Sequence, residues 1–427
     1  MPFRFVHTAD LHLDSPLRSL ALREPALAEL VATASRAALT RIVDLCLEER
    51  GDALLVAGDL TDGAQTSIKT ARFLVSELAR ATVAGVRVFV IRGNHDARAR
   101  ATRGLLWPEG VTVFGSRDAP VRLDGAADGR DVLVHGVSFA DPTCATSLLP
   151  RYAPPEADAL SVGLMHTSLG GSEGHDAYAP VSESALAEAG YAYWALGHIH
   201  RPMHHRRSPA IVMAGIPQGR DIGEAGARTV TLAALSGDGT VALETRSVAL
   251  ARFERVDVAL TEAGRRAAIS AALETLRAVA EDVPEEHLIV RLGLHVQGDG
   301  AWRLIRDRDL VEADLREALA GSGIWLERAD VAATTPQEAP GAASGSAAGE
   351  LARLVTRDVL PDPGFAASAG EIAEALVRDL PGELRDAFGS QETDRADRLG
   401  RLAAQGAAEI LARLASDGDE PALSEDD

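Results

Sequence analysis

Cysteine is scarce in this 427-residue chain, which contains only Cys46 and Cys144. The two residues form no Cys-x-x-Cys pair, so the sequence lacks the pattern of a disulfide framework or of a thiolate zinc site. Long apolar runs are also missing, because no stretch approaches the roughly 18 consecutive apolar residues of a membrane-spanning helix. At the N-terminus, no charged leader precedes an apolar segment. We therefore expect a soluble, cytoplasmic protein that binds no membrane.

Positive charge and aromatic side chains are also in short supply. The chain has 43 Lys and Arg residues against 63 Asp and Glu residues, which gives a formal net charge of -20. This charge argues against binding nucleic acid by overall positive potential, although a local basic groove is compatible with it. Aromatic residues make up only 4% of the chain, so we expect cores built mainly from Leu, Val, Ile and Ala. The length predicts two or three domains.

The first part of the chain alternates short apolar runs with helical patterns. Such alternation predicts an α/β layered core with a partly parallel sheet. Strands are predicted at 4–8, 52–57, 86–91, 111–114, 131–134, 161–165, 193–196, 212–214, 229–234 and 241–248, and helices at 35–49 and 68–84. This first domain is expected to cover residues 1–250.

The remaining residues change in character. A small αβ module is predicted at 251–333, with strands at 253–259 and 287–294 around a helix at 262–279. The Gly-, Ala-, Ser- and Pro-rich segment 334–349 has the composition of a flexible linker. Residues 350–415 are helical and charged, and residues 416–427 form an acidic tail that we expect to be disordered.

Polar motifs follow five of the predicted strands, where α/β sheets place their functional sites. They are Asp10-Leu11-His12, Gly58-Asp59-Leu60-Thr61-Asp62, Gly93-Asn94-His95-Asp96, His166, and Gly197-His198-Ile199-His200. In an extended segment, the side chains of Asp10 and His12 share a face and can grip one ion. Gly58 allows a tight turn that lets Asp59 face inward.

Each motif alone is also explained by ordinary turn chemistry, and a lone histidine such as His166 is more often structural. Their conjunction favours a metal site instead. Carboxylate, imidazole and amide oxygen together suit Mn, Fe or Zn. Two ions roughly 3.5–4 Å apart, bridged by a carboxylate, can bind phosphate oxygens, create hydroxide and stabilise the leaving oxygen. The sequence therefore predicts a metal-dependent phosphoesterase.

The five motifs resemble, in order, the D-x-H, G-D-x-x-D, G-N-H-[DE], H and G-H-x-H pattern of the calcineurin-like metallophosphoesterase superfamily. This resemblance implies a four-layer α/β/β/α sandwich with a small α+β cap domain and a helical C-terminal region. It also implies two ligand sets: Asp10, His12, Asp59 and His200 for one ion, and the bridging Asp59 with Asn94, His166 and His198 for the other. By the same resemblance, His95 lies beside the phosphate, where it steadies the transition state or protonates the leaving oxygen, and Asp62 orients it.

Three further segments are similar to bacterial DNA repair exonucleases of the SbcD and YhaO type. They are His7 to Leu17, Gly174 to Pro180, and Ala214 to Arg220. The resemblance implies a DNA exonuclease that acts on DNA ends with two divalent ions, Mn²⁺ first and Fe or Zn as alternatives. Arg220 is the expected substrate contact. An SMC-like coiled-coil ATPase subunit and a homodimer are the expected partners.

Two other functions fit part of the pattern. A small-molecule, nucleotide-type metallophosphoesterase would suit the acidic charge better, and a non-catalytic scaffold for an SMC-like ATPase would keep metals for structure only. The His95–Asp62 pair argues against the scaffold, since a purely structural site does not need it. Several cations flank the motifs and either hold DNA phosphates or reflect an arginine-rich composition: Arg98, Arg100, Arg103, Arg201, Arg206 and Arg207. His175 is a further substrate-side candidate, whereas His204 and His205 are interpreted as a loop.

Overall fold

A computed structural model describes residues 1–15, 25–63, 67–98, 105–170, 178–262, 264–297, 301–333, 347–379 and 392–414. The chain divides into two compact units. The first unit comprises Met1–Glu254 and Glu281–Ile289, and the second comprises Arg255–Ala280 and Val290–Asp427.

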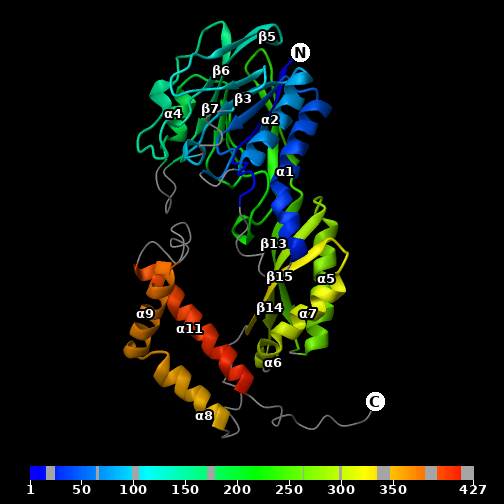
Figure 1. Ribbon diagram of the computed structural model, residues 1–427, viewed down its shortest axis with the longest axis vertical. Coiled ribbons are helices and arrows are strands. Elements are labelled where there is room, and N and C mark those ends of the chain that lie inside the picture. Colours follow the sequence, from blue (N-terminus) through cyan, green and yellow to red (C-terminus); the bar gives the residue numbers. More distant parts are fainter. Residues whose placement is uncertain are drawn as a thin grey trace. The chain divides into compact units, whose positions relative to one another are not determined.

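Two six-stranded sheets form the centre of the first unit (Figure 1). One has the order β12-β11-β1-β2-β3-β4, and the other has the order β5-β6-β7-β8-β10-β9. The strands of the first sheet are β1 (Phe3–Thr8), β2 (Ala53–Ala57), β3 (Arg87–Ile91), β4 (Val111–Val113), β11 (Thr229–Leu235) and β12 (Val241–Ser247). Those of the second are β5 (Val121–Ala127), β6 (Arg130–Gly136), β7 (Ala159–His166), β8 (Tyr193–Gly197), β9 (Met203–Arg207) and β10 (Ala210–Met213). Strands β1 to β4 are parallel to one another, as are β6, β7, β8 and β10.

Helices cover the outer face of each sheet, as Figure 1 shows. Helices α1 (Pro25–Glu48) and α2 (Ile68–Val83) pack on the first sheet, and the short α4 (Glu183–Glu188) packs on the second. In β2, Leu54 packs toward the helices while Leu55 packs between the two sheets. All five residues of β2 are buried, because a strand covered on both faces has no polar side. The predicted α/β/β/α sandwich is confirmed.

A smaller three-stranded sheet, β13-β14-β15, is built from the segments after residue 250. Its elements are β13 (Ala251–Leu260), α5 (Arg265–Glu281), β14 (His287–Val296), α6 (Ala301–Arg306), α7 (Arg308–Leu319) and β15 (Ile324–Ala333). The strand–helix–strand order predicted here is confirmed. Helices α6 and α7 and strand β15 complete a module that sequence patterns had only partly outlined.

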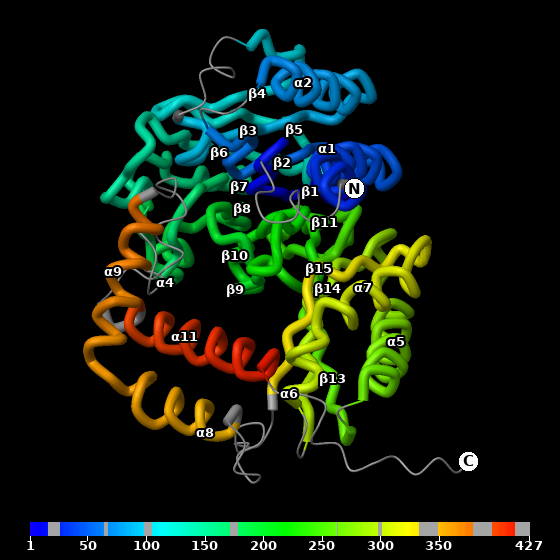
Figure 2. Tube along the Cα trace, turned by 60° about the horizontal axis from the view of Figure 1, so that its bottom comes forward, coloured from blue at the N-terminus to red at the C-terminus, as the bar shows by residue number. Residues whose placement is uncertain are grey.

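The last described segments are helical. They are α8 (Ala347–Leu354), a π turn (Val355–Val359), α9 (Pro363–Asp379) and α11 (Glu392–Leu414). In the second unit, α11 packs beside α9 and against α6 (Figure 2), and Arg308 contacts Glu409 at 2.8 Å. Residues 334–346 of the predicted linker and the whole predicted acidic tail lie outside the described residues. Within the described ranges, no helix combines the length and apolar character that crossing a membrane requires.

Some sequence expectations were wrong. The loop predicted at His204 and His205 is strand β9, an edge strand of the second sheet. Four of its five residues are exposed, so no alternation of apolar and polar side chains marks it as a strand. Helix α1 begins at Pro25, ten residues before its predicted start.

Substituting Gly163 with alanine tests how tightly β7 packs against β8. A Cβ atom at Gly163 would lie 2.3 Å from Cζ3 of the fully buried Trp194. We expect Gly163→Ala to lower the free energy of unfolding by about 1–3 kcal/mol, as overpacking does, in urea or thermal denaturation. Gly51→Ala is the control, because its nearest neighbours stand at ordinary contact distances of 3.4 and 3.8 Å. Equal stability of the two variants would contradict the packing described here.

Candidate metal centre

The five motifs meet at one edge of the sandwich. They follow the C-terminal ends of β1, β2 and β3 in one sheet and of β7 and β8 in the other, and neighbouring parallel strands end at the same side. The two sheets are joined here by a hydrogen bond of 2.9 Å between Nδ1 of His166 and the carbonyl oxygen of Ala57. Side chains far apart in sequence therefore converge on one region.

The loops after β1 and β2 run side by side and fix each other's backbone. The backbone N–H groups of Asp10 and His12 donate to the carbonyl oxygens of Gly58 and Asp59 at 2.9 and 3.0 Å. Asp10, His12 and Asp59 have φ angles of 53°, 40° and 52°. The extended segment predicted for Asp10 to His12 is therefore wrong, although the two side chains do converge. Such left-handed backbone costs non-glycine residues about 1–3 kcal/mol each and tends to occur at functional sites.

Two motif glycines allow the loops to approach so closely. Gly58 has a φ of 96°, and a Cβ atom there would lie 2.6 Å from Nδ1 of His166. A Cβ atom at Gly93 would lie 2.2 Å from Oδ1 of Asp59. Any side chain at either position would collide with a predicted ligand or force strained backbone.

The first ligand group consists of Asp10, His12 and His200, whose candidate ligand atoms all lie within 4.8 Å of one another. The Nε2 atoms of His12 and His200 are 3.2 Å apart. Two nitrogen ligands at about 2.1 Å from one ion, at right to tetrahedral angles, lie about 3.0–3.4 Å apart. Oδ2 of Asp59 is 3.8 Å from Nε2 of His12. These atoms fit the ligand set predicted for the first ion.

The second group consists of Asp10, Asp59 and His166. Nε2 of His166 lies 3.3 Å from Oδ2 of Asp59 and 3.0 Å from Oδ1 of Asn94. When the Nδ1–H of His166 donates a hydrogen bond to the carbonyl oxygen of Ala57, the lone pair of Nε2 faces two oxygen acceptors. A cation between these atoms stabilises that arrangement. Burial lowers the pKa of His166, but the charge and hydrogen bond of Asp59 outweigh it and raise the pKa to about 9. The group therefore favours positive charge, and Asp59 lies where the bridging carboxylate was predicted.

His198 lies beside this second group. Its backbone N–H donates to both carboxylate oxygens of Asp10, at 3.1 and 3.0 Å. Its ring centroid is 5.1 Å from that of His166 and 5.1 Å from that of Tyr178. The ring nitrogens of His198 do not belong to any of the clusters found among the described residues, so this predicted ligand is adjacent to the group rather than within it.

The predicted His95–Asp62 pair is present, with 3.1 Å between Nδ1 and Oδ1. Asp62 also accepts a hydrogen bond from the hydroxyl of Ser15 at 2.9 Å and lies 3.5 Å from Nδ1 of His12. Burial lowers the pKa of His95, but the Asp62 hydrogen bond and the charges of Asp59 and Asp62 raise it overall. The His95 side chain is 38% exposed, whereas Asp59 is 2% exposed. His95 is therefore more accessible than the buried ligands Asp10, His12, Asp59 and His166.

Two carboxylates that hold the loops in place were not assigned roles from the sequence. Asp96 is buried and accepts hydrogen bonds from the backbone N–H groups of Leu60, Thr61 and Gly93, all at 3.1 Å. Burial and the nearby charge of Asp59 raise its pKa to about 6. Asp14 accepts hydrogen bonds from Arg36 on α1 and Thr70 on α2. Asp14 and Asp96 both lie in segments that the sequence analysis singled out, but the sequence does not show which groups their carboxylates contact.

Arg220 and Glu224 lie on the His200 side of the site. Glu224 contacts Nδ1 of His200 and Nη2 of Arg220, each at 2.7 Å. Burial raises the pKa of Glu224, but the His200 hydrogen bond and the charge of Arg220 lower it overall. Nη2 of Arg220 lies 3.3 Å from Nδ1 of His200, so its guanidinium lies near the ligands. Glu224 had no signal in the sequence.

The other polar candidates lie elsewhere. His7 is buried, with Nδ1 2.9 Å from the hydroxyl of Tyr193, and the ring of His135 packs at 4.8 Å against Tyr191. Both side chains are buried within the first unit and contact aromatic residues. Three candidates lie outside the described residues: Arg100, Arg103 and His175.

Comparisons with known proteins agree with this geometry. Residues 3–202 match the family model of the calcineurin-like phosphoesterases, and residues 253–334 match that of the middle domain of metallophosphoesterase YhaO. The chain is 34% identical over 268 residues to the uncharacterized metallophosphoesterase YhaO of Bacillus subtilis, which covers 62% of this chain and 65% of that protein. It is 29% identical over 225 residues to the DNA double-strand break repair protein Mre11 of Methanopyrus kandleri, covering 48% and 47%. The chain thus spans less than two thirds of the length of either relative.

Similar solved structures include a Thermus thermophilus protein, TT1561, with a TM-score of 0.34 and 16% identity. A dimetal phosphatase from Danio rerio has a TM-score of 0.35 and 12% identity. Each alignment covers 58% of this chain, with 100% of the first protein and 97% of the second. The family match and the converging motifs identify residues 3–202 as a calcineurin-like phosphoesterase domain.

Proposed function

We propose that this chain is a DNA exonuclease that hydrolyses phosphodiester bonds with two divalent ions, Mn²⁺ in the first instance. The observation that carries the proposal is the convergence of carboxylates and imidazoles from five loops beside the His95–Asp62 pair. One ion would be held by Asp10, His12, Asp59 and His200, and the other by Asp59, Asn94, His166 and His198. When bound, the ions supply the positive charge and the activated hydroxide that attack on an anionic phosphodiester needs.

The chain's own residues supply proton transfer. Asp62 accepts a hydrogen bond from the Nδ1–H of His95 and so fixes the orientation of the imidazole. The opposite ring nitrogen, Nε2, would then protonate the leaving oxygen. The exposure of His95 beside buried ligands is what a group that meets substrate requires.

DNA is favoured as the substrate by similarity and by local charge. Of the relatives, one is named as a DNA double-strand break repair protein. Arg201 follows His200 directly, Arg206 and Arg207 lie on the nearby strand β9, and all three are exposed. None of these three arginines has an ion pair within the described part of the chain, although the chain is acidic overall. Such cations can hold backbone phosphates and guide a strand toward the site.

Metal binding should stabilise the fold, because the ions bind the native protein but not an unfolded chain. We expect Mn²⁺ added to chelator-treated protein to raise its melting temperature, in line with about 2.7 kcal/mol at 100 times the dissociation constant. Asp59→Asn should show a smaller gain, because it weakens the bridge between both ions. Glu77→Gln is a matched control, since Glu77 pairs with Arg80 at 2.8 Å on α2, and it should gain as the wild type does. If Mn²⁺ does not change the melting temperature of the wild-type protein, the metal site is refuted.

DNA hydrolysis should be observed with linear duplex DNA and Mn²⁺. We expect His95→Ala to lower the rate by about 10²–10⁴-fold, the usual contribution of general acid–base catalysis, while keeping the wild-type melting-temperature gain with Mn²⁺. Asp59→Asn should lose both activity and most of the gain, and Glu77→Gln should keep both. Turnover is measured as nucleotide release and, in parallel, on bis-p-nitrophenyl phosphate.

The outcomes separate the alternatives. Cleavage of the small diester without any DNA degradation would favour a small-molecule metallophosphoesterase. Mn²⁺ binding without turnover on either substrate would favour a scaffold. Wild-type turnover by His95→Ala would remove His95 from the mechanism.

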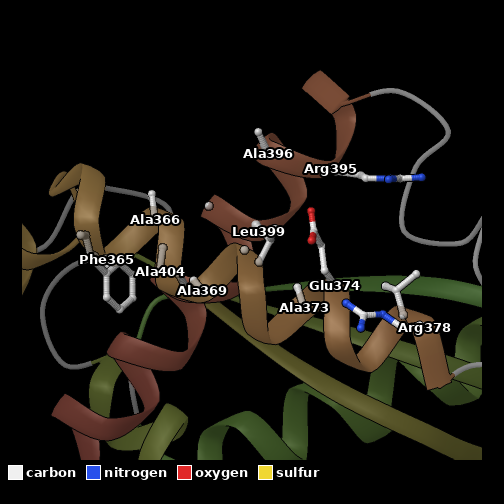
Figure 3. A pocket seen from close by; sticks show the side chains of 15 residues that line it. Phe365, Ala366, Ala369, Ala373, Glu374, Arg378, Arg395, Ala396, Leu399 and Ala404 are labelled. Atoms are coloured by element: carbon white, nitrogen blue, oxygen red, sulfur yellow. The ribbon is translucent and has the colours of Figure 1, made fainter.

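The C-terminal helices are the proposed docking site for an SMC-like coiled-coil ATPase. A groove of about 850 Å³ between α9 and α11 is lined by small side chains such as Ala369, Ala373 and Ala403. Figure 3 shows these helices with Glu374, Arg378 and Arg395 at the end away from Phe365. Small residues let a partner helix approach closely, and exposed apolar residues on α9 and α11 suit an amphipathic helix. These are Ile372, Leu376, Leu402 and Ile410.

Co-purification tests this partner. We expect the double variant Ile372→Asp and Leu376→Asp to lose a co-expressed coiled-coil ATPase that the wild type retains. Ile68→Asp, an equally exposed position on α2 (69%), should retain it. Light scattering on the chain alone identifies the other occupant, because a wild-type dimer that the double variant abolishes would make the groove a homodimer interface instead.

A further inference from the structure

Glu224 connects a predicted metal ligand to the predicted substrate-binding arginine. It ends a short 3₁₀ turn, Ile222–Glu224, whose start is capped by the side chain of Asp221. The Glu224 side chain is only 11% exposed. Its Oε1 atom lies 2.7 Å from Nδ1 of His200 and 2.7 Å from Nη2 of Arg220, and Oε2 accepts from the backbone N–H of Arg220 at 2.8 Å. A single carboxylate therefore holds both side chains.

The contact with His200 determines which nitrogen faces the ions. A carboxylate can only accept here, so the proton of a neutral His200 stands on Nδ1. The lone pair then lies on Nε2, which is the atom 3.2 Å from Nε2 of His12 at the metal centre. A partner of this kind fixes both the tautomer and the ring orientation of a metal ligand.

The contact with Arg220 orients its guanidinium. Nε and Nη2 of Arg220 both contact the Glu224 carboxylate, at 2.7 to 3.3 Å. Within the described part of the chain, Nη1 of Arg220 has no hydrogen-bond partner, and the side chain is 26% exposed. Nη2 of Arg220 also lies 3.3 Å from Nδ1 of His200, which places the guanidinium beside the predicted ligands. The remaining N–H groups are thus available to a phosphate oxygen.

The backbone around Glu224 and His200 is held by hydrogen bonds that do not involve the Glu224 side chain. Arg228, which is 6% exposed, donates to the carbonyl oxygens of Glu224 and His200, both at 2.9 Å. The main chains of the two segments therefore keep their places when the Glu224 side chain is altered. A substitution at Glu224 therefore tests the role of the carboxylate while its loop stays folded.

We propose that Glu224 is a positioning residue that couples the metal ligand His200 to Arg220, which contacts a non-bridging oxygen of the substrate phosphate. The Arg220 half of the proposal rests on the proposed phosphodiesterase function, whereas the His200 half does not. Loss of the carboxylate should therefore weaken metal binding and substrate binding together, whereas loss of the arginine should weaken only the second.

Metal affinity and kinetics of matched variants test the coupling. For Glu224→Ala we expect Mn²⁺ affinity, measured by calorimetry on the full chain, to fall about 10- to 100-fold, as it does when such partners of metal ligands are lost. Glu224→Asp keeps the charge and should recover part of the affinity. Arg220→Lys should keep wild-type Mn²⁺ affinity and raise KM for bis-p-nitrophenyl phosphate at saturating Mn²⁺, with a smaller change in kcat. Adding Arg220→Lys to Glu224→Ala should raise KM by less than it does in the wild type.

The controls separate coupling from simple destabilisation. Glu77→Gln alters another Glu–Arg pair, in which Glu77 is buried and Arg80 is partly exposed, and it should leave Mn²⁺ affinity and KM unchanged. If Glu224→Ala lowers only the melting temperature of the metal-free protein, with Mn²⁺ affinity within two-fold of the wild type, the proposal is overturned. A wild-type protein without phosphodiesterase turnover would defeat the proposed function, yet the Mn²⁺ affinities would still decide whether Glu224 positions His200.

Discussion

Asp59 carries a buried negative charge at the point where loops from both sheets meet, and the surrounding structure depends on how that charge is balanced. Its carboxylate accepts the backbone N–H of His95 at 3.0 Å and faces the imidazoles of His12, in the loop after β1, and His166, at the end of β7. A buried carboxylate is costly unless hydrogen bonds and positive charge surround it. The left-handed backbone and the two closely packed glycines allow these segments to approach the Asp59 carboxylate.

Much of this could be predicted from the sequence, because the strands that carry the site are buried on both faces. Continuous apolar runs such as β2 and β7 are easy to recognise, and the polar motifs follow them directly. Backbone angles at Asp10 and His12 were not predictable, since the conformation is imposed by hydrogen bonds to a loop about 48 residues away in the chain. Glu224 had no local pattern either, because its partner His200 precedes it by 24 residues, with strands β9 and β10 between them.

The residues of the candidate site all lie within the first unit. The segment Met1–Glu254 contains every predicted ligand, the His95–Asp62 pair, and Glu224 with its partners His200 and Arg220. The β13-β14-β15 module coincides with the stretch that matches the YhaO middle domain, and the helices after it carry the α9–α11 groove. The segments after the first unit are therefore not needed to bring the candidate site residues together.

The four outer strands of the sandwich have a consequence for how the protein behaves in concentrated solution. An exposed strand edge is a template for pairing with another chain. Here β4 is only three residues long, β5 and β9 pair with shifted register, and β12 and β9 carry charged residues such as Glu244 and Arg206. Short, irregular or charged edges pair poorly, so these sheets resist growing into one another. The arginines of β9 thus protect the folded chain from edge-to-edge aggregation, whatever else they bind.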